Sequence, residues 1–299
     1  MEPKIDNRPP KRDEPWTIGR LLDWTAKFLA QKGSEFPRLD AEVLLSHALG
    51  CKRIELYTRY EELAAEEARA RFKELIRKRL EGCPVAYLVG RKEFFSLEFE
   101  VGPTVLIPRP DTETLVVEAL RLAKEMTEPA VLDLGTGSGA IPIAIAKRHK
   151  TARLTATDVS LEALAVAQRN AAKHGVAERI HFLHGDLFEP ISSEERFDFI
   201  LSNPPYIARE DIAALPVGVR DYEPHLALDG GIGGYAVFDR LIHEAPRYLK
   251  PGGYLIVEIG APQEGPARQR IAAYAGYDLG PTIKDGSGHP RVLRARWHG

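Results

Sequence analysis

The feature that most constrains this 299-residue chain is an alternation of short apolar runs and helical segments after Asp111. Apolar runs typical of buried strands occupy residues 130–134, 154–157, 180–183, 197–201 and 254–259. Helical patterns over residues 141–148 and 161–174 separate the first three runs, and Ser160 can open the second helix. Parallel strands need crossover helices of this kind. The pattern therefore predicts an α/β domain with a largely parallel sheet covered by helices.

The first part of the chain has a different pattern. Residues 1–15 are polar and proline-containing, and we expect a disordered tail there. Helical periodicity follows over residues 18–29, 39–49 and 68–80. Plausible start and stop residues flank these helices, namely Thr17, Asp40, Gly33, Gly50 and Gly82. We therefore predict a small N-terminal helical bundle domain over residues 16–84.

Aromatic and apolar residues alternate between Phe95 and Val101, which is typical of a strand or hairpin. We expect residues 85–107 to form a β-hairpin linker. The α/β domain would then occupy residues 108–299.

Charge and composition exclude several classes of protein. The chain has 41 Lys and Arg against 43 Asp and Glu, so it lacks the basic excess of proteins that bind long stretches of nucleic acid. We therefore expect no direct nucleic-acid binding. The two cysteines, Cys51 and Cys83, lie far apart, which disfavours a disulfide framework or a cysteine zinc site. No signal peptide or membrane-spanning run is evident, and we expect a cytoplasmic monomer without a metal.

The strand over residues 130–134 leads into a glycine-rich turn. The run 131–139 reads Val-Leu-Asp-Leu-Gly-Thr-Gly-Ser-Gly, and glycines allow the backbone to approach a ligand closely. The candidate cofactor-binding residues here are Asp133, Gly135, Thr136, Gly137, Ser138 and Gly139. The Asp133 carboxylate would either pair with a ligand ammonium group or fix the loop by accepting backbone N–H bonds. A tight turn without a ligand is the alternative.

Two acidic residues follow later strands. Asp158 lies nineteen residues past Gly139, where a carboxylate can accept hydrogen bonds from ribose hydroxyls. Asp186, after the strand over residues 180–183, could meet an adenine amino group or could simply be a turn residue. The glycine spacing lacks the wider G-x-G-x-x-G pattern of dinucleotide sites, which disfavours a dehydrogenase.

A second motif, Asn203-Pro204-Pro205-Tyr206, follows the fourth strand and would face the same crevice. An amide or exocyclic amine is a weak nucleophile whose NH2 group carries two donors. The Asn203 side-chain oxygen and the Pro204 carbonyl can accept from those donors and orient the nitrogen. The prolines stiffen the loop, and Tyr206 can stack on a planar group. A proline-rich turn with a buried tyrosine is the alternative.

The Asp133–Gly139 loop with Asp158 and Asp186 resembles the seven-strand S-adenosylmethionine-dependent methyltransferases. The resemblance implies a Rossmann-like domain and S-adenosyl-L-methionine as cofactor. It also implies that the loop cradles the methionine part, Asp158 binds ribose and Asp186 binds adenine. Leu187, after Asp186, replaces an aromatic residue of some relatives and would make apolar contact with adenine.

Asn203-Pro204-Pro205-Tyr206 resembles the motif of enzymes that methylate glutamine side chains or adenine N6. The run 108–113, Pro-Arg-Pro-Asp-Thr-Glu, is similar to the signature of the peptide chain release factor glutamine N5-methyltransferases, and Glu223-Pro224 continues the match. This resemblance implies transfer of a methyl group to the glutamine of a Gly-Gly-Gln motif in class 1 release factors. It makes Asn203, Pro204 and Tyr206 catalytic, with Asn203 also near the cofactor. These three and Pro205 would bind substrate, and the helical domain would recognise it.

Four questions stay open at this point. A ribosomal protein is an alternative glutamine substrate, and adenine in nucleic acid is an alternative of another class. Arg109 either pins its loop through a salt bridge or contacts cofactor or substrate. For Glu223, the alternative to a direct role is that it braces the loop after Tyr206. A non-catalytic binding protein on a relic cofactor fold is a further rival, which the intact motifs disfavour.

Overall fold

The computed structural model describes residues 15–299, and it divides into two compact units. One ends at Val89 and the other comprises Gly90–Gly299. The expected tail over residues 1–15 lies outside the described residues except for Pro15. None of the described helices is both long enough and apolar enough to cross a membrane.

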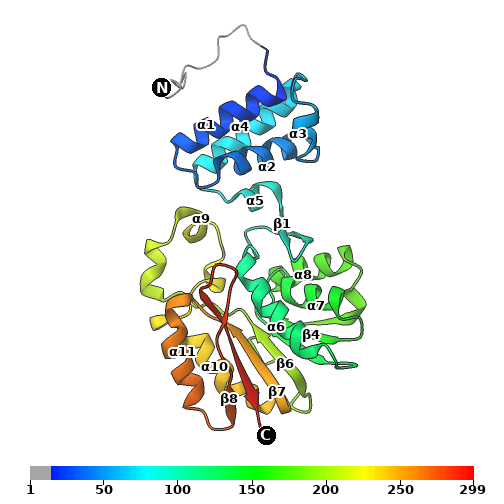
Figure 1. Ribbon diagram of the computed structural model, residues 1–299, viewed down its shortest axis with the longest axis vertical. Coiled ribbons are helices and arrows are strands. Elements are labelled where there is room, and N and C mark those ends of the chain that lie inside the picture. The colour runs from blue at the N-terminus through cyan, green and yellow to red at the C-terminus, as the bar shows by residue number, and fades with distance from the viewer. Residues whose placement is uncertain (1–14) are drawn as a thin grey trace. The chain divides into compact units, whose positions relative to one another are not determined.

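The first unit is helical (Figure 1). Its elements are α1 (Ile18–Gln31), α2 (Pro37–Leu49), α3 (Glu55–Thr58), α4 (Glu66–Leu80) and α5 (Val85–Val89). The three expected helices are confirmed with boundaries within about two residues. Thr17 caps α1 by accepting a hydrogen bond from the Arg20 amide, and Gly50 ends α2 in the left-handed conformation. The core gathers the fully buried side chains of Leu22, Leu44, Leu45 and Leu56.

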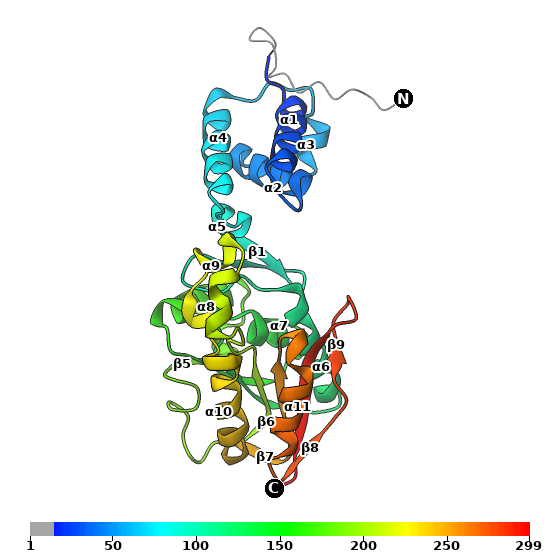
Figure 2. The same cartoon turned by 90° about the vertical axis from the view of Figure 1, so that its left-hand side faces the viewer.

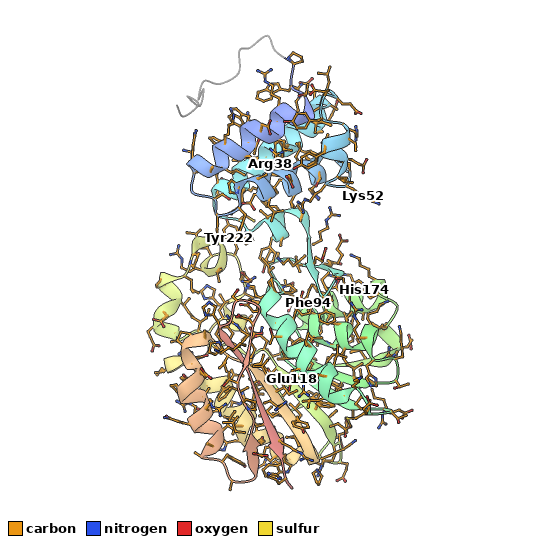
Figure 3. All side chains as sticks on the ribbon, in the orientation of Figure 1. Arg38, Lys52, Phe94, Glu118, His174 and Tyr222 are labelled. Atoms are coloured by element: carbon orange, nitrogen blue, oxygen red, sulfur yellow. The ribbon has the colours of Figure 1, made fainter. Side chains whose placement is uncertain are left out.

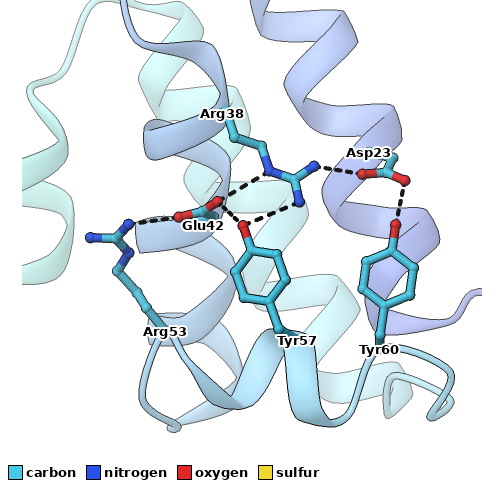
Figure 4. A network of polar contacts seen from close by, with 6 residues as sticks. All are labelled: Asp23, Arg38, Glu42, Arg53, Tyr57 and Tyr60. Atoms are coloured by element: carbon cyan, nitrogen blue, oxygen red, sulfur yellow. Dashed lines mark hydrogen bonds and ion pairs between the residues drawn. The ribbon is translucent and has the colours of Figure 1, made fainter.

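A polar network joins α1, α2 and α3 on the surface of this unit (Figure 4). Arg38 donates to Asp23 and, over 3.1 Å, to Glu42. Burial raises the pKa of Asp23, but hydrogen bonds from Tyr60 and Arg38 outweigh it and hold this pKa below its usual value. Because many of these side chains are partly exposed, each ion pair adds little, and the network mainly fixes how the helices pack.

The expected β linker over residues 85–107 is corrected by the structure. Residues 85–89 form α5 in the first unit, and the hairpin of β1 (Arg91–Phe94) and β2 (Leu97–Glu100) belongs to the second. The hairpin turns through Phe95 and Ser96, both at positive φ. Two-residue hairpin turns usually contain Gly or Asn. Because this turn contains neither, the sequence does not indicate its position. Phe94 and Phe99 pack edge to face, and the Phe99 ring contacts His174. Figure 3 labels Phe94 and His174.

The second unit is built on one sheet with helices on both faces (Figures 1 and 2). Its strands are β3 (Ala130–Leu134), β4 (Arg153–Asp158), β5 (Ile180–His184), β6 (Phe197–Ser202), β7 (Leu249–Glu258), β8 (Tyr277–Leu279), β9 (Ile283–Lys284) and β10 (Pro290–Trp297). Their order is β5-β4-β3-β6-β7-β10-β8, with β9 paired to β10. Strands β3 to β7 pair in parallel, whereas β10 runs antiparallel to its three neighbours.

The helices of this unit are α6 (Glu113–Ala123), α7 (Ala140–Arg148), α8 (Leu161–Lys173), α9 (Val217–Arg220), α10 (Ala236–Glu244) and α11 (Glu264–Ala272). The five expected strands and the two expected helices are confirmed. Strand β7 begins five residues before its expected start, and β8 to β10 were not predicted. The expected α/β class is confirmed, with the two-residue β9 bringing the sheet to eight strands.

The sheet order places the site. Strand order reverses between β3 and β6, which lie side by side with Leu134 opposite Ser202. In open α/β sheets, ligands bind at the carboxyl ends of the strands at this switch point. The glycine loop follows β3, and Asn203 follows β6, so the two sequence motifs flank it.

Candidate functional site

The glycine loop leaves β3 in a conformation that only glycine adopts without strain. Gly135, Gly137 and Gly139 have φ values of 73°, 55° and 79°. A β-carbon on Gly139 would lie 2.9 Å from the Ile143 side chain and 3.1 Å from Ala167 of α8. The loop therefore packs tightly on the helices behind it while its front faces the crevice.

Asp133 is buried beneath this loop. Its side chain is 1% exposed, and neither carboxylate oxygen has a hydrogen-bond partner among the described residues. The Thr136 hydroxyl beside it is also buried without a partner. Burial raises the pKa of Asp133 to about 7. The second hypothesis from the sequence is that Asp133 fixes the loop by accepting hydrogen bonds from backbone N–H groups. No such bond is present among the described residues.

Asp158 instead ties the loop to the next strand. Its carboxylate accepts from the Gly137 amide over 2.8 Å and from the Ser160 amide over 2.9 Å. Burial raises the pKa of Asp158, and these backbone bonds oppose the rise. Each oxygen keeps a lone pair, so the carboxylate still has acceptor capacity.

Asp186 lies further out. Its half-exposed carboxylate pairs with Arg240 of α10 over 2.9 Å. Leu187, at a positive φ of 50°, is buried, and its carbonyl accepts from the Thr157 hydroxyl. An adenine amino group would therefore meet an acidic group that already has a basic partner.

Asn203 begins the loop after β6. Its Nδ2 group donates to Thr112 Oγ1 over 3.1 Å. The Tyr206 side chain is partly buried, and burial raises its pKa to about 12, with the nearby Glu258 carboxylate adding to the rise. Glu258 itself is 1% exposed, and burial raises its pKa to about 7.

The loop is braced from several sides. Gln263 Nε2 donates to the Tyr206 carbonyl over 3.0 Å and to the Gly234 carbonyl. Gly230 has no room for a side chain, because a β-carbon there would lie 2.8 Å from the Pro205 carbonyl oxygen. These contacts hold residues 204–206 in one conformation.

Arg109 and Glu223 form a further brace. Arg109 pairs with the buried Glu223 and donates to the Ile107 carbonyl over 2.9 Å. Glu223 also accepts from the Ile107 amide. The salt-bridge interpretation of Arg109 therefore has direct structural support, and the hydrogen bonds of Glu223 brace the segment at Ile107 and Arg109.

We expect Glu223→Gln to lower the free energy of unfolding by about 1–3 kcal/mol, because it weakens a charge-assisted pair to Arg109 in a buried setting. Chemical denaturation checks this. Arg209→Gln is the matched control, since its pair with Asp229 is exposed, and it should change stability by less than about 0.5 kcal/mol. Equal effects of the two variants would contradict the bracing role.

Two cavities meet at Asn203. The larger, about 480 Å³, is lined by Gly135, Gly137, Asp158, Asp186, Leu187, Asn203 and Pro205 of the predicted set. The smaller, about 70 Å³, is lined by Asn203, Pro204 and Tyr206. Neither cavity is lined by the remaining residues of the glycine loop, which are Asp133, Thr136, Ser138 and Gly139. The side chains of Asp133, Thr136 and Ser138 are buried.

Sequence reasoning missed several residues around the site. Thr104, Val105 and Leu106 line the larger cavity from one side, and Pro224, Leu226, Ala227 and Asp229 line it from another. Asn170 of α8, which is fully buried, donates to the Ser138 carbonyl and to the Glu100 carbonyl. It thereby ties the glycine loop to the hairpin. Its place in a helical pattern gave no signal of this role.

Comparison with known proteins decides the family. Residues 20–90 match the family model described as the PrmC N-terminal domain, and residues 111–217 match the methyltransferase small domain. The release factor glutamine methyltransferase of Rhodopirellula baltica is 46% identical over 285 residues, which cover 94% of this chain and 96% of the relative. The chain belongs to the release factor glutamine methyltransferase family. The family member from Geobacter sulfurreducens is also 46% identical, over 96% of this chain and 99% of its own.

A solved structure gives the fold independently. The hMettl16 catalytic domain, in complex with an RNA hairpin, has a TM-score of 0.56 at 17% identity and covers 75% of this chain and 81% of that one. At this identity the likeness shows the fold alone, which confirms the Rossmann-like methyltransferase domain.

Family membership confirms the expected enzyme class and its cofactor, S-adenosyl-L-methionine. The site fits this group. The Asp133 carboxylate is buried behind the loop without a partner, where its charge would favour a positively charged group in front of the loop. The Asp158 carboxylate keeps acceptors for ribose hydroxyls. The larger cavity, with apolar walls and a few acidic groups, has the character of a small-molecule site.

Proposed function

We propose that this protein methylates the side-chain nitrogen, N5, of the glutamine in the Gly-Gly-Gln motif of class 1 peptide chain release factors. The proposal is supported by the names of its relatives, which cover nearly the whole chain. It is carried by one observation on the site: Asn203 separates a cavity that suits the cofactor from a much smaller one beside Pro204 and Tyr206.

The size of the smaller cavity favours an amide over a base. About 70 Å³ holds a group the size of a few water molecules. A terminal carboxamide has three heavy atoms outside its alkyl chain, whereas adenine is a fused double ring. Glycines beside the target glutamine would let an exposed loop reach into this narrow space.

The cofactor supplies an electrophilic methyl group on a sulfonium. In our proposal Asn203 Oδ1 and the Pro204 carbonyl accept the two N–H bonds of the glutamine amide and point its nitrogen at that methyl group. Pro205 and Tyr206 hold the amide plane. The nitrogen–carbon bond forms as the sulfur–carbon bond breaks with its electron pair on sulfur, and the extra proton on nitrogen passes to water. Positioning of this kind is worth ~7 kcal/mol or more in favourable cases.

The remaining residues of the site bind the cofactor in this proposal. The 133–139 loop, with Gly135, Thr136, Gly137, Ser138 and Gly139, cradles the methionine part, and Asp133 attracts its ammonium group. Asp158 binds ribose, while Asp186 and Leu187 face adenine. The helical unit holds the rest of the release factor. We further expect a cytoplasmic monomer without direct nucleic-acid contact.

Mass spectrometry of release factors after incubation with the enzyme and cofactor tests the proposal. We expect a single added methyl group on the Gly-Gly-Gln glutamine, and none on a release factor with glutamate at that position. Ribosomal proteins and adenine-containing nucleic acid serve as competing substrates in parallel reactions. Methyl transfer to either of these, with none to release factor, would overturn the proposal.

A further inference from the structure

Thr112 and Asn203 lie far apart in the sequence, yet their side chains meet in the site. Asn203 Nδ2 donates to Thr112 Oγ1 over 3.1 Å. Thr112 is 5% exposed and precedes α6, but its side chain makes no capping hydrogen bond. The Thr112 hydroxyl is therefore free of any hydrogen bond that caps α6.

Glu258 lies next to this contact. Strands β6 and β7 pair in parallel with Ser202 opposite Val257. Asn203, the residue after β6, and Glu258, the last residue of β7, follow this pair. The Glu258 carboxyl is 1% exposed and lies near enough to the Thr112 hydroxyl for this hydroxyl to oppose the rise of its pKa. Its Oε2 has no partner among the described residues. No step of the proposed function uses this buried acidic group.

We propose that Thr112 and Glu258 are positioning residues that decide which end of the Asn203 amide faces the reacting nitrogen. The inference rests on the proposed function, because it assigns Asn203 Oδ1 as the acceptor for the substrate amide. The two ends of an asparagine amide are nearly equal in shape, so packing alone does not choose between them.

The choice follows from counting protons. A hydroxyl has one proton, and the Glu258 carboxyl, once it is ionised above its raised pKa of about 7, can only accept. When the Thr112 proton is directed at Glu258, Thr112 presents only lone pairs to Asn203. Asn203 must then turn its Nδ2 donors to Thr112, which leaves Oδ1 for the substrate. In the reverse orientation, Nδ2 donors would face the NH2 donors of the glutamine, and no hydrogen bond would form.

A matched pair of variants tests this inference. Thr112→Val keeps the shape of the side chain but removes the hydroxyl, whereas Thr112→Ser keeps the hydroxyl. We expect Thr112→Val to lower kcat about tenfold or more, while the dissociation constant of the cofactor stays within about twofold. Thr112→Ser should restore most of the turnover. Wild-type turnover in Thr112→Val, or an equal loss in both variants, would overturn the inference.

A spectroscopic measurement tests the same contact without turnover. The chain has three asparagines, at positions 7, 170 and 203, so selective ¹⁵N labelling gives three side-chain amide pairs. We expect Thr112→Val to shift the Asn203 pair and speed its exchange with water. The Asn170 pair, held by the Ser138 and Glu100 carbonyls, should not change. An unchanged Asn203 pair would overturn the inference even if the enzyme methylates release factor.

Glu258→Gln provides a second, independent variant. Gln carries both a donor and an acceptor, so it no longer forces the Thr112 proton in one direction. We expect a smaller loss of kcat than in Thr112→Val, with the Asn203 signals split or broadened between two orientations. A single wild-type Asn203 signal with full turnover would remove Glu258 from the inference. If wild-type enzyme fails to methylate release factor, the proposed function fails, and the amide spectra still report on the contact.

Discussion

Asn203→Ala is expected to lower kcat by about 100- to 1,000-fold while leaving the dissociation constant of S-adenosylmethionine within about threefold. The reason is that its side-chain oxygen acts on the substrate nitrogen, which must be oriented only when the methyl group is transferred. In our proposal the glycine loop and Asp158 hold the cofactor, and the hydrogen bond that joins them does not involve the Asn203 side chain.

Steady-state kinetics on release factor and calorimetry with the cofactor alone check this result. Thermal unfolding of the variant shows whether the fold is kept. Equal losses of turnover and cofactor affinity would argue that Asn203 serves the cofactor and does not orient the glutamine.

Asp133→Asn is expected to have two opposite effects. Without cofactor, the variant should be more stable than wild type, and its advantage should grow by about 2–3 kcal/mol between pH 5 and pH 8. In wild type, the folded-state pKa of Asp133, at about 7, lies well above the usual aspartate value of 3.8. The stability that the protonated carboxyl provides is complete below about pH 3.8 and is lost as the pH rises through about 7. The asparagine amide does not titrate and avoids this loss.

The same substitution should weaken cofactor binding. Removing one partner of a buried charge pair costs about 2 kcal/mol or more, which corresponds to a loss of roughly 30-fold in affinity. Calorimetry of binding and urea denaturation at pH 5 and pH 8 measure both effects. Asp186→Asn is the control for stability, because its carboxylate is half exposed and paired with Arg240. A variant that loses affinity without gaining stability at pH 8 would contradict an unpaired buried charge at Asp133.

The sequence predicted the core of the α/β unit well, because apolar strands of four to six residues separated by helical repeats leave few other folds. It placed the glycine loop after β3 and Asn203 after β6, and both lie at the switch point. The strand boundaries differ by few residues, except at β7. There Pro251, Gly252 and Gly253 interrupt the apolar run, so the strand was expected to start only at Tyr254.

Other features depend on contacts between distant residues. The hairpin turn at Phe95 and Ser96 carries no turn signal, and the short helices α3 and α5 are too brief to show a period. The brace between Arg109 and Glu223 joins residues more than a hundred positions apart. Asn170, which ties the glycine loop to the hairpin, looks like any polar residue of a helix.

The sequence by itself determined which chemical group follows each strand. These groups are a glycine turn, an acidic strand end and an asparagine before two prolines, and each is recognised from local residue types. The tertiary structure alone decided the charge state and orientation of the groups that act. Asp133 has its pKa raised because the fold buries it without a partner, and the Asn203 amide donates to Thr112, which lies 91 positions earlier in the chain. Burial and hydrogen bonding depend on neighbours in space, and a linear pattern does not contain them.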